Sequence, residues 1–253
     1  MGIGECPWIW IHSPSLEKFE ALSLNSRVSL HESNEASCIS LPALRTLKLS
    51  VSDQRVNVAG LFERATLPAL RALDYEDTSN LHGVYWPLTQ IVRLLSRSMC
   101  SIQSLRLILP PVPNLDLDFI RLFRHVPSLK ELHLGRDMAS ISSLLLQALT
   151  LQPPSSDNNT TPLLPLLESF CVDIRSQNST FEEKALVDMI ASRRISQTVV
   201  PSLSGVACLK TVKINRYPAA LVTLRKRVLK DLALFTREGF EFTFVSEADL
   251  GDL

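Results

Sequence analysis

The sequence lacks an excess of charge of either sign. It has 26 Lys and Arg residues against 26 Asp and Glu residues in a chain of 253, for a formal net charge of +0 at pH 7. Proteins that bind nucleic acids usually carry a basic field, because Lys and Arg must neutralise the phosphate backbone. We therefore expect no nucleic-acid partner.

Cysteine, histidine and glycine are sparse and show no spacing typical of a catalytic or metal site. The five cysteines are odd in number, far apart and without a C-x-x-C pair, which disfavours a disulfide framework or a zinc site. The five histidines have no metal-ligand spacing, and only eight glycines are present, with no Gly-rich phosphate loop. We predict no catalytic residues, no metal, no cofactor and no enzymatic activity.

Long apolar runs are also missing. No stretch of 18 consecutive apolar residues exists, and the first residues have no basic region followed by an apolar run, as a signal peptide would. The cysteine pattern fits a reducing compartment. We expect a cytoplasmic or nuclear protein that makes no contact with a membrane.

What the sequence does contain is a recurring frame of apolar residues, L-x-x-L-x-L. The clearest copy is Leu129, Leu132 and Leu134 within the segment VPSLKELHLG. Six further copies are Phe19/Leu22/Leu24, Leu44/Leu47/Leu49, Leu70/Leu73/Tyr75, Ile102/Leu105/Leu107, Leu167/Phe170/Val172 and Leu209/Val212/Ile214. Their first positions are 19, 44, 70, 102, 129, 167 and 209. The shorter steps have the length of leucine-rich repeats, and the longer ones imply insertions.

The frame has a direct structural meaning. Its last two apolar positions lie two residues apart, so in a short strand they point to one face while their neighbours point to the other. One unit cannot bury its apolar face alone, so successive units must stack. We predict an α/β leucine-rich-repeat solenoid of about seven to eight repeats, with a curved parallel sheet on the concave face and helices on the convex face.

This architecture predicts one repeat domain over residues 15–245. Residues 1–14 are an N-terminal cap or the remnant of a preceding segment, 152–162 form a flexible insertion, and 246–253 form an acidic tail. Apolar residues at helical spacing predict helices at 88–99, 115–126, 138–151, 181–195 and 218–238, and residues 56–62 predict a short helix or turn. Arg193 and Arg194 lie near the end of one of these segments, where they suit the helix dipole. We expect a solvated helix end, with a patch for a partner as the alternative.

The positions around the last two frame residues predict the exposed side chains of the concave face. Between those two residues lie Ser23, Lys48, Asp74, Arg106, His133, Cys171 and Lys213. Charges of both signs alternate with small residues, which is typical of a protein-binding surface, although solvated strand positions without any ligand would look the same. The predicted protein-binding residues are Lys48, Asp74, Glu76, Arg106, Glu131, His133, Asp173 and Lys213.

Several longer segments resemble a known family. YWPLTQIVRLLSRSMCSIQSLRL (85–107), VPSLKELHL (126–134) and VDMIASRRIS (187–196) followed by LKTVKI (209–214) are similar to leucine-rich-repeat regions of fungal (basidiomycete) F-box proteins. The resemblance covers roughly residues 40–245. It implies the substrate-recognition part of a Skp1–cullin–F-box ubiquitin ligase, in which the repeats hold the target. The F-box itself is not present, because nothing in residues 1–40 matches its Leu-Pro-x-Glu opening.

The sequence therefore predicts a non-catalytic protein–protein interaction module. Its target is unknown, Skp1 and a cullin are further partners if an F-box is supplied elsewhere, and the chain is expected to be a monomer. Two alternatives stay open: a stand-alone leucine-rich-repeat binding protein with no ligase link, and a non-functional gene fragment.

Overall fold

The computed structural model describes residues 14–24, 38–52, 58–77, 87–109, 115–135, 142–152, 161–174, 183–199, 205–216, 226–236 and 239–246. The chain forms two compact units, residues 1–110 and 111–253, and each is described by itself. The repeat domain predicted over 15–245 spans both units. The predicted N-terminal segment, the insertion at 152–162 and the acidic tail lie almost entirely outside the described residues.

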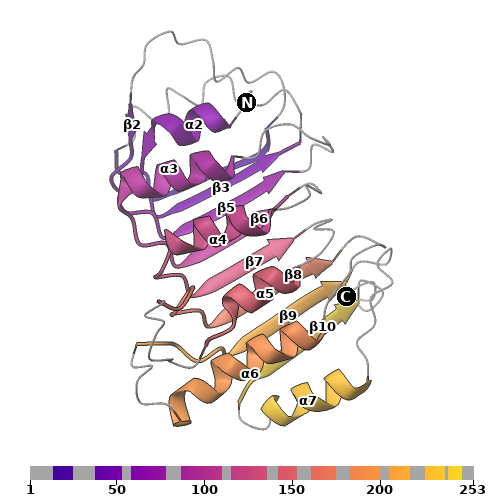
Figure 1. Cartoon of the computed structure of the whole chain (residues 1–253). Helices are drawn as coiled ribbons and strands as arrows, with labels where there is room; N and C mark the ends of the chain where they lie inside the picture. Colours follow the sequence, from indigo (N-terminus) through magenta and orange to yellow (C-terminus); the bar gives the residue numbers. More distant parts are fainter. Residues whose placement is uncertain are drawn as a thin grey trace. The chain divides into compact units, whose positions relative to one another are not determined.

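The first unit is built on parallel strands that follow one another in chain order (Figure 1). These strands are β1 (Lys18–Leu24), β3 (Thr46–Val51), β5 (Ala72–Asp77) and β6 (Ser104–Ile108). Its helices are α2 (Ala59–Arg64) and α3 (Leu88–Ser98). A second, two-residue parallel pairing joins β2 (Ile39–Ser40) to β4 (Ala65–Thr66), which the sequence pattern did not predict.

The second unit repeats the same plan of a strand followed by a helix. Its parallel strands are β7 (Glu131–Gly135), β8 (Ser169–Ile174), β9 (Thr211–Arg216) and β10 (Glu241–Ser246). Its helices are α4 (Asp116–Arg124), α5 (Ser143–Leu149), α6 (Glu183–Val199) and α7 (Lys226–Thr236). The predicted α/β class with parallel strands and intervening helices is confirmed. Among the described residues, no helix has the length and apolar character needed to cross a membrane.

The apolar frame forms the core of both units. In six of the seven copies, every frame residue is at most 2% exposed. These residues are Leu44, Leu47, Leu49, Leu70, Leu73, Tyr75, Ile102, Leu105, Leu107, Leu129, Leu132, Leu134, Leu167, Phe170, Val172, Leu209, Val212 and Ile214. The apolar face of each strand is buried, because strand side chains alternate between the two faces of a sheet.

The first copy of the frame is the exception, because its predicted register is wrong. Phe19 pairs with Leu47 and Ala21 with Leu49, and the carbonyl of Glu17 accepts the Arg45 N–H at 2.8 Å. The frame in this repeat therefore begins three residues earlier than Phe19. The sequence suggested Leu22 and Leu24 as the last two residues of the frame. Pairing with β3 instead puts Phe19 and Ala21 at these two positions, and the small side chain of Ala21 is buried.

The repeats are joined by recurring backbone hydrogen bonds. Ahead of the frame, four segments with the pattern apolar-Pro-x-Leu close a tight turn, as where the Leu44 N–H donates to the Leu41 carbonyl at 3.3 Å. Proline favours such a turn because its fixed φ suits the second position. Further on, neighbouring repeats within each unit are linked through one carbonyl: Arg45 O, for example, accepts from the N–H groups of Arg71 at 2.8 Å and Ala72 at 3.0 Å. The sequence repeat is thus a structural repeat.

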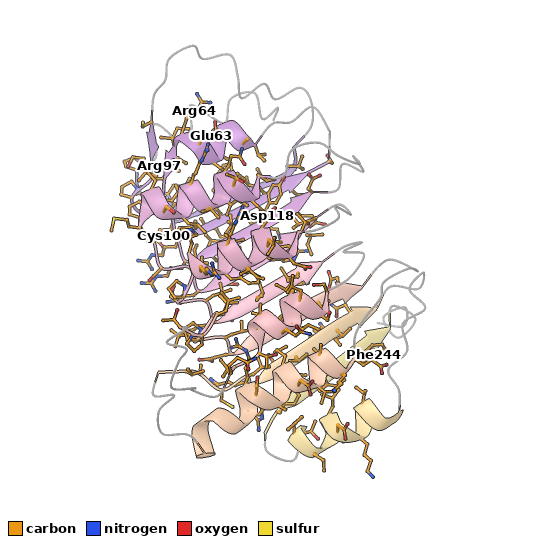
Figure 2. The ribbon with its side chains drawn as sticks, viewed as in Figure 1. Glu63, Arg64, Arg97, Cys100, Asp118 and Phe244 are labelled. Atoms are coloured by element: carbon orange, nitrogen blue, oxygen red, sulfur yellow. The ribbon has the colours of Figure 1, made fainter. Side chains whose placement is uncertain are left out.

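Arginine side chains bind backbone carbonyls at the ends of helices and in the turns that follow them. In the first unit, Arg97 of α3 donates from Nη2 to the Phe62 carbonyl at 2.7 Å and from Nε to the Ala65 carbonyl at 3.0 Å (Figure 2). The next residue, Ser98, is buried, and its Oγ accepts the Leu67 N–H at 2.9 Å. The last carbonyls of a helix have no partner within it, so these contacts satisfy groups that would otherwise be unpaired.

Arg193 of α6 plays the same part in the second unit, and the prediction that it is solvated is wrong. Its side chain is 0% exposed. It donates to the carbonyls of Leu149 at 2.7 Å, Leu163 at 2.7 Å and Leu164 at 3.0 Å. Burial lowers the pKa of Arg193 to about 10, so the guanidinium stays charged at neutral pH. The three carbonyls compensate that buried charge, because each directs the negative end of its dipole at it.

Candidate functional site

The predicted binding residues lie on the strand face that alternates with the core. On β5, Leu73 and Tyr75 are buried, whereas Asp74 and Glu76 between and beyond them are partly exposed. We call this side the polar strand face. Its residues considered below are Lys48, Asp74, Glu76 and Arg106 in the first unit, and Glu131, His133, Cys171, Asp173, Lys213 and Asn215 in the second.

In the first unit, four of the predicted residues form one ionic cluster. Lys48, Asp74 and Arg106 are direct neighbours in the register of β3, β5 and β6. The Arg106 Nη1 atom lies 2.7 Å from Asp74 Oδ1 and 3.3 Å from Glu76 Oε2. The Lys48 Nζ atom lies 3.8 Å from Asp74 Oδ2. Two cations and two carboxylates therefore balance one another on the face.

The electrostatics of this cluster centre on Arg106. Burial lowers the pKa of Arg106, but the hydrogen bond and charge of Asp74, together with Glu76, outweigh it and raise the pKa overall. The Arg106 side chain is still 29% exposed, so solvent screens these pairs and their net contribution to stability is small. Their main effect is to hold charged groups in defined positions.

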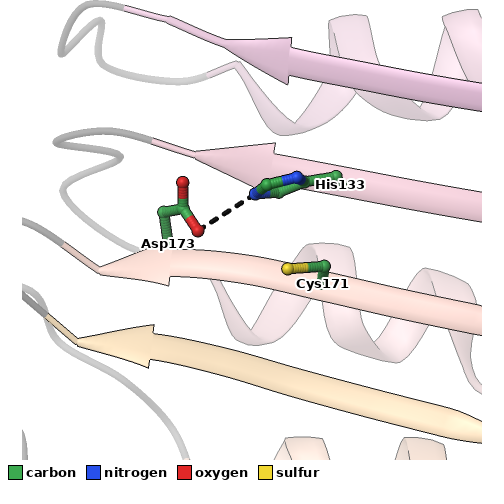
Figure 3. A group of neighbouring side chains, drawn as sticks. All are labelled: His133, Cys171 and Asp173. Carbon is green, nitrogen blue, oxygen red and sulfur yellow. Dashed lines mark hydrogen bonds and ion pairs between the residues drawn. The ribbon is translucent and has the colours of Figure 1, made fainter. Parts of the chain in front are cut away.

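In the second unit, His133 of β7 faces Cys171 and Asp173 of β8 (Figure 3). The His133 Nε2 atom lies 3.0 Å from Asp173 Oδ1. Asn215 of β9 donates from Nδ2 to the same Asp173 oxygen at 2.6 Å and to Cys171 Sγ at 3.6 Å. Four polar side chains from three neighbouring strands thus converge on one point.

The buried carboxylate controls the charge of this second cluster. The Asp173 side chain is only 3% exposed, and that of His133 is 25% exposed. Burial lowers the pKa of His133, but the hydrogen bond and negative charge of Asp173, together with the neighbouring Cys171, outweigh it and raise the pKa to about 9. The imidazole is therefore protonated at neutral pH and pairs with Asp173.

The predicted residues consequently fall into three groups. Lys48, Asp74, Glu76 and Arg106 gather in the first unit, and His133 and Asp173 gather in the second. Glu131 and Lys213 are exposed. Asp173 is among the predicted binding residues, but its side chain is buried, so it orients His133 and is not itself accessible to a partner.

Cys171 and Asn215 are members of the cluster that were not among the predicted binding residues. Both stand at face-forming positions next to the frame, and register pairs Cys171 with His133 and Asn215 with Asp173. Stacking the repeat copies by their frames would therefore have brought them together. The nitrogen, sulfur and oxygen atoms of His133, Cys171 and Asp173 all lie within 4.8 Å of one another, and such donors can hold a metal ion.

Comparison with known proteins does not assign the chain to a family. No protein-family model matches it, and no curated protein matches it significantly. Conclusions about function therefore depend on the side chains and their geometry, together with the resemblance of the repeat segments.

Proposed function

We propose that this chain is a leucine-rich-repeat solenoid that binds another protein through its polar strand face and performs no catalysis. The buried L-x-x-L-x-L frame, the recurring proline turns and the parallel strands with intervening helices support this fold. Repeat scaffolds of this kind spread many side chains over one extended surface.

One observation carries the binding role: charged side chains of both signs are fixed on the polar strand face by ion pairs while remaining accessible. Arg106 holds Asp74 and Glu76, and all three are partly exposed. A mixed pattern of charges suits the surface of a protein, whereas nucleic acid would require a uniformly basic one. Side chains that are already held in place lose less conformational entropy when a partner binds.

The resemblance to fungal F-box proteins gives this role a biological setting. The repeats would hold the substrate of a ubiquitin ligase, and Skp1 and a cullin would join through an F-box supplied elsewhere. A stand-alone leucine-rich-repeat binding protein is the second candidate, because the polar strand face needs no ligase to hold a target. Both candidates use the same face, so one experiment tests them together.

The test is a pull-down of the tagged chain from a fungal lysate, read by mass spectrometry. The face variant is Lys48→Glu with Lys213→Glu, and the control is Arg93→Glu with Arg121→Glu on the exposed sides of α3 and α4. We expect one protein to be recovered with the wild-type chain and the control but lost with the face variant. Equal recovery with both variants would contradict the proposal.

The same experiment distinguishes the two settings. Skp1 and a cullin among the recovered proteins would support the ligase role, and a specific target without them would support a stand-alone binding protein. Recovery of chaperones alone would indicate an unstable gene fragment and would overturn the binding role.

A further inference from the structure

The cluster of His133, Cys171 and Asp173 has a chemistry that protein binding does not require. It combines an imidazole nitrogen, a thiol sulfur and a carboxylate oxygen, which are the three donor types of protein zinc sites. These donor atoms lie within 4.8 Å of one another. The ionic cluster of the first unit differs, because its members Lys48, Asp74, Glu76 and Arg106 include no imidazole and no thiol.

We propose that His133, Cys171 and Asp173 together bind a Zn²⁺ ion, with the side-chain amide of Asn215 beside them. This inference concerns the second unit only and does not depend on the proposed protein-binding function. Thiolate with imidazole favours zinc or a similar transition metal, whereas Ca²⁺ and Mg²⁺ prefer sets made only of oxygen.

The geometry needs only small side-chain movements. Zinc lies about 2.0–2.3 Å from such ligands, so a tetrahedral site separates its ligand atoms by about 3.3–3.8 Å. The His133 Nε2 and Asp173 Oδ1 atoms are 3.0 Å apart and would move slightly away from each other. The ligand atoms of these two residues lie at most 4.8 Å from the Cys171 sulfur, so any distance that exceeds the tetrahedral value needs to shorten only slightly. The backbone under these residues is held by the parallel pairing of β7 and β8, so it need not rearrange.

Asn215 is placed to supply a fourth ligand. Its Nδ2 atom lies 2.6 Å from Asp173 Oδ1 and 3.6 Å from Cys171 Sγ. Rotation of the amide by half a turn would present Oδ1, an acceptor, at the same place. Four protein ligands would make a closed structural site joining β7, β8 and β9, and three would leave one position for water.

The charges also balance in this arrangement. A thiolate and a carboxylate carry two negative charges, which one Zn²⁺ neutralises at a site where Asp173 is almost fully buried. On binding, the thiol proton of Cys171 and the ring proton shared between His133 and Asp173 leave to solvent. No oxidant or other reactant is needed.

The experiment is a titration of the full, chelator-treated chain with Co²⁺, a spectroscopic substitute for Zn²⁺. We expect one Co²⁺ per chain, a thiolate-to-metal charge-transfer band, and loss of that band when Zn²⁺ is added. Cys171→Ser should abolish the band, and Asp173→Asn should weaken binding by about tenfold or more. Cys208→Ser is the matched control, because Cys208 is also a partly buried free cysteine of the second unit.

A second measurement uses the wild-type chain, so it tests the proposal even if a variant fails to fold. Alkylation of Cys171, followed by peptide mass spectrometry, should slow several-fold with Zn²⁺ while alkylation of Cys208 is unchanged. Absence of a thiolate band in the wild-type chain, survival of the band in Cys171→Ser, or equal alkylation with and without Zn²⁺ would each overturn the proposal and leave a purely hydrogen-bonded cluster.

Discussion

Replacing Arg193 by Met should cost more stability than any substitution of an exposed arginine in this chain. Methionine keeps the length of the side chain and fills much of its volume, but it removes every hydrogen-bond donor. The carbonyls of Leu149 and Leu163 would then lose their partner inside the protein, whereas the Leu164 carbonyl keeps the N–H of Leu167. The backbone of Leu164 is in the left-handed region, with φ of 50°, so this turn also loses a contact that holds a strained residue.

The magnitude follows from the two carbonyls that lose their partner. A buried polar group without a partner costs about 1–3 kcal/mol, so two could cost roughly 2–6 kcal/mol in a rigid structure. Removal of the buried charge itself offsets part of this loss, and water can reach part of the site after small movements. We therefore expect a loss of about 2–4 kcal/mol, a large part of the roughly 5–15 kcal/mol that stabilises a typical domain.

The assay is urea unfolding followed by circular dichroism, with amide hydrogen exchange to locate the effect. Arg121→Met on the exposed side of α4 is the control and should change stability by less than about 0.5 kcal/mol. Arg193→Lys should fall between the two, since one ammonium group cannot reach three carbonyls. Exchange should accelerate at the end of α5 and near Leu164. A loss under about 1 kcal/mol for Arg193→Met would refute the reasoning.

Three further predictions concern the strands. Leu132→Asp should cost about 3 kcal/mol or more by burying an unpaired charge, whereas Glu131→Ala beside it should cost under about 0.5 kcal/mol; equal losses in urea unfolding would contradict the strand register. In a double-mutant cycle, Arg106→Ala and Asp74→Asn should show a coupling energy of about 0.5–1 kcal/mol that decreases with added salt, and a salt-independent value would argue against an ion pair. The folded-state pKa of His133 is raised from 6.5 to about 9, so its contribution of about 3 kcal/mol should be present below pH 6.5 and lost as pH rises through 9. Unfolding of the wild-type chain and of the control His133→Asn, measured with a chelator across this pH range, checks the direction of the change. A wild-type chain that gains stability relative to the control as pH rises would contradict the prediction.

The repeated core was predictable because its information is local. A frame such as Leu70, Leu73 and Tyr75 fixes which side of its own strand is apolar, whatever the rest of the chain does. Helices such as Leu88–Ser98, predicted at 88–99, follow from spacing within one segment for the same reason. The recurrence of the frame then required the strands to stack, because no single repeat could bury its apolar face.

Register and partners were less predictable because they depend on residues far apart in sequence. In the first repeat, the predicted frame of Phe19, Leu22 and Leu24 was wrong, and only hydrogen bonding to β3 placed Phe19 opposite Leu47. Arg193 has the sequence context of a solvated helix end, yet the preceding helix and turn supply three carbonyls around it. The environment of such a residue is set by its neighbours in space.

The same division applies to the polar strand face. The sequence by itself determined which residues alternate away from the core, including Lys48, Arg106 and His133, because alternation is a property of one strand. Only the tertiary structure decided that Arg106 would bind two carboxylates and that His133 would meet Asp173, beside Cys171. Distances of a few ångströms between side chains depend on how adjacent strands pair, and that pairing is fixed by hydrogen bonds between segments some 40 residues apart, as the His133 and Asp173 pair is.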